Sequence, residues 1–264
     1  MKYKTNRLTT SLYNFKKYKF VWLLVLSTAT SCVSPKKMVY FQNMEVKEEI
    51  EVVKNFETKI QVGDILSINV SAVDGEAVLP FNLYDVPITQ GAYGDPLTYL
   101  VDIAGEINFP VLGTIKVSGS STKELTKSLE GKLKDYIKNP TVNVRIENFK
   151  ITVLGEVKNP GTFKIDNERI SIIEALGLAG DLGIQANRNN ILLVREINKE
   201  RKFVSIDLTD KKLFASPYFY LAQNDVIYVE PNRTKINSSA IGANTGTIIS
   251  SISILISVVA LLLR

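Results

Sequence analysis

The 264-residue sequence contains no histidine and only one cysteine, Cys32. Without histidine the chain cannot build a Ser-His-Asp triad, a histidine general base or a histidine metal site. A single cysteine cannot form a disulfide within the chain. The sequence also lacks the Gly-rich loop ending in lysine that cradles nucleotide phosphates. These absences exclude histidine-based catalysis and histidine metal sites. We expect a protein that is not an enzyme and that uses no metal and no cofactor.

Acidic residues are absent from the first 32 positions, which hold six of the 32 basic residues. The remainder of the chain has 26 basic and 27 acidic residues, a formal charge of −1, although the pI of the whole sequence is about 9.0. The basic character thus belongs to the N-terminal segment, so a basic surface for nucleic acid is not indicated and no nucleic-acid partner is expected.

Residues 1–31 have the pattern of a secretory signal peptide, with a basic start, a short apolar stretch and small residues at the end. Cys32 follows these small residues directly, in the position of the lipidated cysteine of bacterial lipoproteins. Ala29 and Ser31 also fit an ordinary small-x-small cleavage site, so both interpretations stay open, with lipidation of Cys32 favoured. Residues 32–59 are expected to form a tether.

No ionisable side chain occurs between Thr247 and Leu263. At ~1.5 Å per residue this run extends for about 26 Å as a helix, close to the thickness of a bilayer's hydrocarbon core. The sequence therefore predicts a membrane-spanning helix within residues 236–264.

Small and hydroxyl-bearing residues of this tail follow one another at spacings of three and four: Ala243, Gly246, Ser250, Ser253, Ser257 and Ala260. This spacing places them on one face of a helix, which we call the serine stripe. The stripe fits close packing against a neighbouring helix and equally fits a pore-facing surface in a ring of identical helices. Both interpretations require several copies of the chain.

Residues 60–148 predict one small α+β domain. Apolar residues alternate from Ile65 to Val70, and two further strands are expected over 99–110 and 113–117. Ser121 and Glu124 form a capping-box pattern at the start of a helix. The buried face of that helix is expected to include Leu125, Leu129, Leu133, Tyr136 and Ile137, and a strand follows at 142–146.

Residues 149–232 predict a second domain with the strand and helix order of a β-grasp fold. A hairpin is expected to turn at Asn159-Pro160-Gly161, with a positive φ at Gly161. Ser171 and Glu174 repeat the capping-box pattern before a short helix, and strands follow near 191–194, 203–208 and 226–229.

Several turn residues are expected to have structural roles: Gly63, Asp64, Gly155, Pro160, Gly161, Asn224 and Asp225. The segment 74–99 contains Tyr84, Tyr93 and Tyr99, which could offer aromatic faces to sugars, although a solvated loop or subunit packing is favoured. Asp74 and Glu76 form a carboxylate pair of the kind that glycoside hydrolysis requires. They leave open a rival function as an enzyme acting on glycans.

Two stretches carry a family resemblance. Residues 61–117 (VGDILSINV, then VDIAGEINFPVLGTIKV) resemble the polysaccharide export domain of the Wza-type outer-membrane exporters. Residues 151–231 (VLGEVKNPGTFKI, SIIEALGLAGDL and YFYLAQNDVIYVEP) are similar to the soluble-ligand-binding β-grasp (SLBB) domain that follows it in that family. This sequence has one such β-grasp unit, fewer than the longest family members.

The resemblance implies a lipoprotein in the outer membrane of a Gram-negative bacterium, with its body in the periplasm. It implies a ring-shaped homo-oligomer that exports capsular polysaccharide or exopolysaccharide. It also implies an inner-membrane partner, either a chain-length regulator or a tyrosine autokinase. The alternative function is a periplasmic, membrane-anchored lipoprotein that binds glycans or acts as a scaffold without forming a pore.

Overall fold

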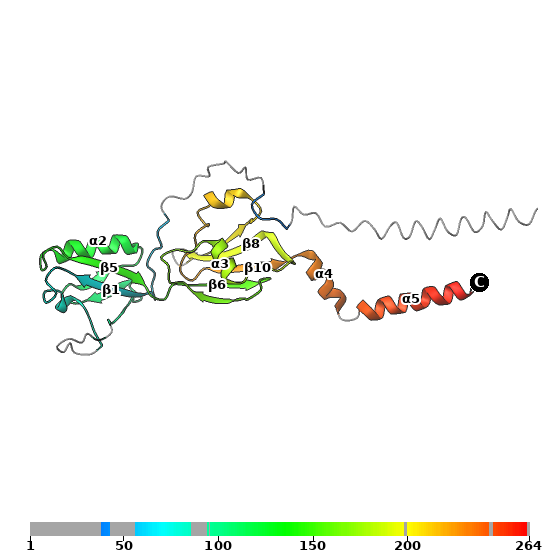
Figure 1. The fold of residues 1–264 in the computed structure, drawn as a ribbon, viewed down its shortest axis with the longest axis horizontal. Helices are drawn as coiled ribbons and strands as arrows, with labels where there is room; N and C mark the ends of the chain where they lie inside the picture. The colour runs from blue at the N-terminus through cyan, green and yellow to red at the C-terminus, as the bar shows by residue number, and fades with distance from the viewer. Residues whose placement is uncertain are drawn as a thin grey trace, which may run out of the picture. The chain divides into compact units, whose positions relative to one another are not determined.

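The computed structural model describes residues 38–42, 56–85, 94, 96–197, 200–242 and 245–262. The predicted signal peptide, the predicted lipidation site Cys32, most of the predicted tether, Tyr93 and Ala243 lie outside these residues. The described residues form a mixed structure of helices and sheets (Figure 1), which confirms the expected class at this level.

The first domain is built on an antiparallel sheet with the strand order β2-β1-β5. Its strands are β1 (Ile65–Ser71), β2 (Tyr99–Leu100) and β5 (Thr141–Ile146). Strand β1 pairs with β5 from Leu66, opposite Ile146, to Ser71, opposite Thr141. Alternate β1 side chains are buried, as the period of two in the sequence predicts.

Helix α2 (Thr122–Leu133) packs on this sheet through one apolar face. Ser121 and Glu124 form the predicted capping box, in which the Glu124 amide donates to Ser121 Oγ and the Ser121 amide donates to Glu124 Oε2. Leu125, Leu129 and Leu133 are fully buried at helical spacing. Tyr136 was expected on the same face but is exposed, because α2 ends at Leu133 and the helical period ends with it.

The expected strand over 99–110 is two strands in the structure. Residues after β2 turn at Gly105, which has a positive φ of 76°, before β3 (Glu106–Phe109) begins. Strand β3 pairs with β4 (Gly113–Lys116) in a separate two-stranded hairpin. A short 3-10 helix, η2 (Leu79–Phe81), lies in the irregular stretch between β1 and β2.

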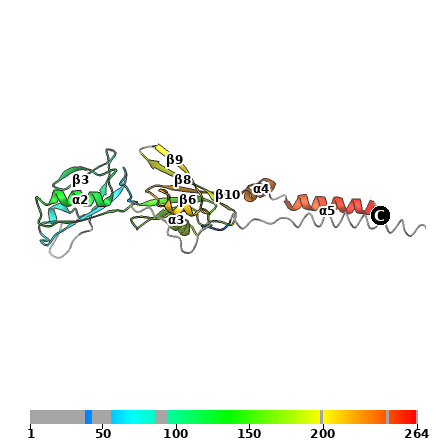
Figure 2. The ribbon, with the colours of Figure 1, turned by 90° about the horizontal axis from the view of Figure 1, so that it is seen from above.

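The second domain contains a five-stranded sheet in the order β7-β6-β10-β8-β9. The strands are β6 (Lys150–Gly155), β7 (Gly161–Lys164), β8 (Ala186–Ile197), β9 (Glu200–Ile206) and β10 (Val226–Pro231). Strand β10 runs parallel to β6, and the other neighbouring strands are antiparallel. Figure 2 shows β8 and β9 side by side as a hairpin.

Helix α3 (Ile172–Leu178) contributes Ile172, Ala175 and Leu176 to the core beneath this sheet. Its N-terminus carries the second predicted capping box, with Ser171 and Glu174 bonded to each other. A 3-10 helix, η3 (Lys211–Ala215), buries Leu213 in the same core. The two domains therefore have separate hydrophobic cores, and Ile146 packs against both.

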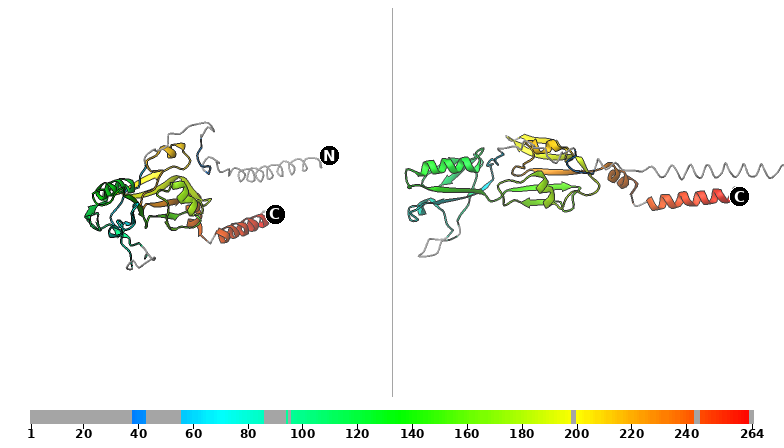
Figure 3. Two further views of the ribbon diagram at one scale, coloured as in Figure 1. Left: turned by 60° about the vertical axis from the view of Figure 1, so that its left-hand side comes forward. Right: turned by 45° about the horizontal axis from the view of Figure 1, so that its top comes forward.

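Two helices follow β10. Helix α4 (Arg233–Ile241) is capped by Asn232, whose side chain accepts a hydrogen bond from the Lys235 amide, and it ends at Gly242, with a φ of 62°. Helix α5 (Thr245–Leu262) is a separate helix (Figure 3). Among the residues that the structure describes, no helix is both long and apolar enough to cross a membrane, so the predicted membrane-spanning helix is not supported.

Gly155 ends β6 at a point where only glycine fits. Its φ is 90°, and a Cβ atom added there would lie 2.1 Å from the carbonyl oxygen of Val229 on β10. The Glu156 amide donates to that same carbonyl at 2.9 Å, so the close approach is part of the sheet's pairing. The positive φ expected at Gly161 is wrong: Gly161 lacks it and begins β7 instead.

We expect Gly155→Ala to lower the free energy of unfolding by about 2–4 kcal/mol, because the new methyl group combines steric overlap with a strained φ. The measurement is urea unfolding followed by circular dichroism. Gly161→Ala is the matched control, since its Cβ would meet nothing closer than 3.9 Å and its φ is ordinary. Equal effects of the two substitutions would contradict this account of Gly155.

Candidate functional site at the domain junction

A buried polar network joins the turn before β1 to the turn before β10. Gln223 Nε2 donates to Asp64 Oδ1 at 3.2 Å and to the Asn148 carbonyl at 2.9 Å. Gln223 Oε1 accepts from the Lys150 amide at 2.8 Å, and Asp64 Oδ2 accepts from the Gln61 amide at 2.8 Å. Each polar atom of the Gln223 amide group thus has a partner, which satisfies the requirement for burying it.

Asn148 extends this network along the segment that connects β5 to β6. Its Oδ1 accepts from the Ile65 amide at 2.9 Å, and its Nδ2 donates to the Gly63 carbonyl at 3.0 Å. Residues from both domains therefore share one set of hydrogen bonds. We call Asp64, Asn148 and Gln223 the junction network.

Asp64 is only 1% exposed, and this burial raises the pKa of its carboxyl group, while the bonds from Gln61 and Gln223 act in the opposite direction. A carboxyl whose pKa is higher in the folded chain than in the unfolded chain holds more protons when folded. Its contribution to stability therefore falls as pH rises between those two values. The contribution of Asp64 to the stability of the fold is accordingly larger below this pH range than above it.

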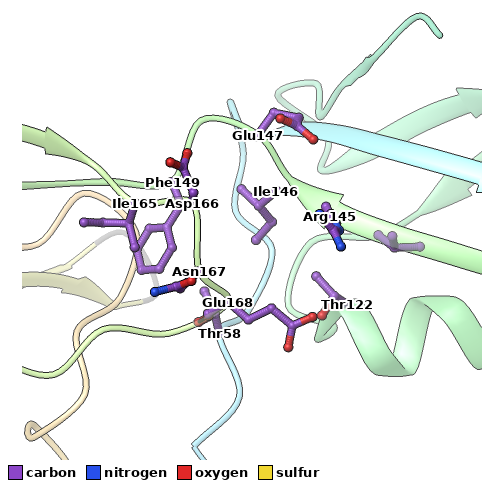
Figure 4. Close-up of a pocket in the computed structure, with 11 residues that line it drawn as sticks. Thr58, Thr122, Arg145, Ile146, Glu147, Phe149, Ile165, Asp166, Asn167 and Glu168 are labelled. Carbon is purple, nitrogen blue, oxygen red and sulfur yellow. Dashed lines mark hydrogen bonds between the residues drawn. The ribbon is translucent and has the colours of Figure 1, made fainter.

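Beside this network lies a cavity of about 460 Å³. Figure 4 shows Phe149 and Ile165 on one side of it and Ile146 and Arg145 on the other. Thr58 lies at its margin and donates from Oγ1 to the Glu168 carbonyl at 3.0 Å. The polar side chains that line the cavity are Thr58, Thr122, Arg145, Glu147, Asp166, Asn167 and Glu168.

A second, more open hollow adjoins the cavity and shares Thr122, Asn167 and Glu168 with it. Tyr220 lies in its wall, with the Phe56 ring 5.4 Å away in a stacked arrangement and the Arg169 guanidinium 5.0 Å from the ring centre. The Phe219 ring also meets the Tyr220 ring edge to face, with centroids 5.0 Å apart, so three side chains of the protein already contact Tyr220.

The N-termini of α2 and α3 also face this hollow through Thr122 and Ser171. Their capping boxes already occupy the Ser121, Glu124, Ser171 and Glu174 amides. The two helix ends therefore keep fewer free amides for an anion than an uncapped end would. The lining of the two hollows mixes carboxylate, amide, hydroxyl and guanidinium groups. Such groups are suited to binding a polar, hydroxyl-rich molecule.

Comparison with known proteins gives this arrangement an identity. Residues 53–147 match the family of polysaccharide biosynthesis/export proteins, and residues 149–229 match the SLBB domain. The chain thus contains a domain of the polysaccharide export type followed by an SLBB domain. We accordingly call the first domain the export domain and the second the SLBB domain; in the junction network, Asp64 belongs to the first match, Gln223 to the second, and Asn148 lies between them.

Two relatives are named as EPS I polysaccharide export outer membrane protein EpsA. The protein of Ralstonia solanacearum is 33% identical over 151 residues, which cover 54% of this chain and 40% of that protein. The protein of Ralstonia nicotianae is 33% identical over 140 residues, which cover 50% of this chain and 36% of that protein. The aligned residues thus span about two fifths of each relative's length.

The carboxylate pair of the rival enzyme function lies outside both hollows. Asp74 Oδ1 accepts from the Glu76 amide at 3.1 Å and from the Ala77 amide at 3.4 Å, so it closes a local turn. Tyr99 is buried and stacked on Phe109 with ring centres 5.6 Å apart, and burial raises the pKa of its hydroxyl to about 12. Its ring is therefore not available to a sugar.

The predicted turn residues have different surroundings in the structure. Gly63 and Asn224 have positive φ angles of 86° and 63°. Asp225 is fully buried and binds the Arg195 guanidinium, with the shortest contact 2.6 Å long between Arg195 Nη2 and Asp225 Oδ2. Pro160 is exposed just before β7. Asp64 and Asp225 thus do more than form turns, since both make buried contacts to side chains distant in sequence.

Sequence reasoning missed Gln223, Asn148 and the lining of the cavity. Burial of Gln223 beside Asp64 depends on a contact between residues 159 positions apart, which no local pattern encodes. The serine stripe is described in part: Gly246, Ser250, Ser253 and Ser257 lie on α5, while Ala243 and the side chain of Ala260 lie outside the described residues.

We expect Gln223→Ala to lower the free energy of unfolding by about 1–3 kcal/mol, because the Lys150 amide and the Asp64 carboxylate each lose a partner where water has poor access. Urea unfolding measures this change. Gln61→Ala is the control, because Gln61 contributes its backbone amide to Asp64 and would keep it. If both variants unfold at the same urea concentration, the Gln223 side chain does not hold the junction.

Proposed function

We propose that this chain is an outer-membrane lipoprotein that assembles with copies of itself into a channel for export of capsular polysaccharide or exopolysaccharide. The observation that carries the proposal is the export domain followed directly by the SLBB domain. The names of the two relatives, both polysaccharide export outer membrane proteins, support it. The β-grasp assignment of the second domain and the domain boundaries belong to the same proposal.

Helix α5 is the part of the chain that we assign to the membrane. Its described large apolar side chains are between 49% and 78% exposed, from Ile248 to Leu261, so the described part of the chain leaves them uncovered. An apolar surface of this kind is expected to meet lipid or other copies of the helix. In the proposal, α5 enters the outer membrane only as part of a bundle with the α5 helices of other protomers, since no helix among the described residues qualifies as a span by itself.

The serine hydroxyls of α5 donate within the helix. Ser250 Oγ donates to the Gly246 carbonyl, Ser253 Oγ to the Ile249 carbonyl and Ser257 Oγ to the Ser253 carbonyl, at 2.8 to 2.9 Å. Each oxygen can still accept a hydrogen bond from water. A row of such acceptors would make a wetted wall that does not hold a passing glycan tightly, which favours movement of the polymer.

The chain itself is proposed to conduct passively and to have no enzymatic activity. Direction and energy would come from polymer synthesis at the inner membrane, through a chain-length regulator or a tyrosine autokinase as partner. The periplasm would contain the export domain, and lipidation of Cys32 after removal of residues 1–31 would add a second attachment to the outer membrane.

Deletion of residues 247–264 is expected to abolish surface polysaccharide in a strain that carries the variant as its sole copy. The physical reason is that the export and SLBB domains would remain but would have no helix in the membrane. Surface polysaccharide is measured by staining and by extraction, with immunoblotting to show that the variant is present. Size-exclusion chromatography in detergent should give an oligomer for the intact chain, and a monomer would contradict the proposal.

Ser253→Leu is expected to reduce export several-fold, because a bulky apolar side chain would replace a hydroxyl on the serine stripe. Ser251→Leu is the matched control: Ser251 also donates to the carbonyl four residues earlier, at 2.8 Å, but lies off the stripe. The measurement is surface polysaccharide per cell. Normal export with Ser253→Leu would instead favour the scaffold lipoprotein, in which α5 only attaches the chain.

A further inference from the structure

One loop of the SLBB domain binds residues 40–41, which lie far before this domain in the sequence. The loop runs from residue 179 to residue 185, between α3 and β8. The Tyr40 hydroxyl donates to Asp181 Oδ1 at 2.7 Å. The neighbouring Phe41 amide donates to the Leu208 carbonyl at 3.1 Å, so this segment is bound by backbone as well as by side chain.

The same loop holds the beginning of α4. The Asn232 amide donates to the Gln185 carbonyl at 2.7 Å. Lys235 Nζ forms an ion pair with Glu156 Oε2 at 2.6 Å, and the Gly183 amide donates to the Glu156 carbonyl at 3.0 Å. The loop, the residues after β6 and the start of α4 therefore form one contiguous surface of the SLBB domain.

This surface exposes large apolar side chains beside cations. Ile184 at the tip of the loop is 73% exposed, and Ile236 on α4 is 54% exposed. Lys158, whose amide donates to the Asp181 carbonyl at 3.1 Å, and Arg233 are exposed cations on the same surface. The acids nearby, Glu156 and Asp181, already bind Lys235 and Tyr40. We call Lys158, Ile184, Arg233 and Ile236 the collar.

Chain connectivity places the collar residues on α4 close to α5 in the sequence. Helix α4 has nine residues and a length of about 14 Å, and only two residues separate Gly242 from α5. The collar is thus within a short reach of a helix whose large exposed side chains are apolar. Isolated isoleucines flanked by lysine and arginine match the boundary between hydrocarbon and phosphate groups, where apolar side chains enter and cations stay outside.

We propose that the collar of the SLBB domain lies against the phospholipid surface of the membrane that α5 enters, with Ile184 and Ile236 inserted among the head groups. Lys158 and Arg233 then pair with lipid phosphates. The inference rests on the proposed function, which assigns α5 to the outer membrane. The collar fixes how close the SLBB domain comes to the lipid, independently of whether a channel opens.

The test places a tryptophan reporter in the full chain. Trp22 is the only native tryptophan, so Trp22→Phe is the background, and Ile184→Trp or Ile236→Trp is added singly. Ile103→Trp in the export domain is the matched control, because Ile103 is 94% exposed and lies outside the collar. Each purified protein is reconstituted into vesicles of phosphatidylethanolamine and phosphatidylglycerol, and flotation shows that it is bound. Circular dichroism shows that it is folded.

Vesicles with phospholipid brominated near the head groups should quench the fluorescence of the Ile184→Trp and Ile236→Trp variants roughly twofold, because an interfacial side chain lies within reach of those bromines. Their emission should also shift to the blue, while the emission of the Ile103→Trp control is unchanged.

Equal quenching of the Ile184→Trp and Ile103→Trp variants in a floating protein would overturn the collar and leave the proposed function standing. A blue shift without quenching would also overturn it, because the reporter would then be shielded by protein and not by lipid. Failure of the protein to float would count against both proposals. A different result would contradict the proposed function alone. In that case the collar reporters are quenched in vesicles, while cells that lack this chain still export polysaccharide normally.

Discussion

The structure depends on the burial of one amide side chain between two hydrophobic cores. Gln223 connects the two domains, because both polar atoms of its amide group are bonded where water has poor access, and Ile146 adds an apolar contact to each core. Without these hydrogen bonds, burial of the Gln223 amide group would destabilise the fold by more free energy than its packing contacts contribute. The cavity lined by Arg145 and Glu168 lies between the same two domains.

Local structure was predictable where a short stretch of sequence contains its own cause. The two capping boxes at Ser121 and Ser171 form as expected, since their partners lie three residues away. The alternation in β1 and the leucines of α2 likewise follow from periodicity alone. The errors arose at boundaries: a glycine with positive φ at residue 105 divides an expected strand, and β8 begins five residues earlier than expected.

The site was less predictable than the fold because its residues meet across large sequence separations. The sequence predicts a turn residue at Asp64. Its burial and its hydrogen bond to Gln223 arise instead from the packing of the second domain. Asp225 was assigned the same role, and its ion pair with Arg195 reflects the position of β8 beside β10. A carboxylate in a turn carries no local sign of whether it faces water. The pairing of distant strands determines whether such a carboxylate is buried, and the periodicity of the sequence does not reveal that pairing.

The serine hydroxyls of helix α5 find their hydrogen-bond acceptors within the helix itself. The hydroxyls of Ser250, Ser251, Ser253 and Ser257 all donate to carbonyls one turn earlier, so none of these donors requires water. The free energy of moving the helix from an aqueous compartment into an apolar one is reduced, because each hydroxyl arrives already satisfied. Helix α5 therefore satisfies these donors in the same way whether water or apolar groups surround it.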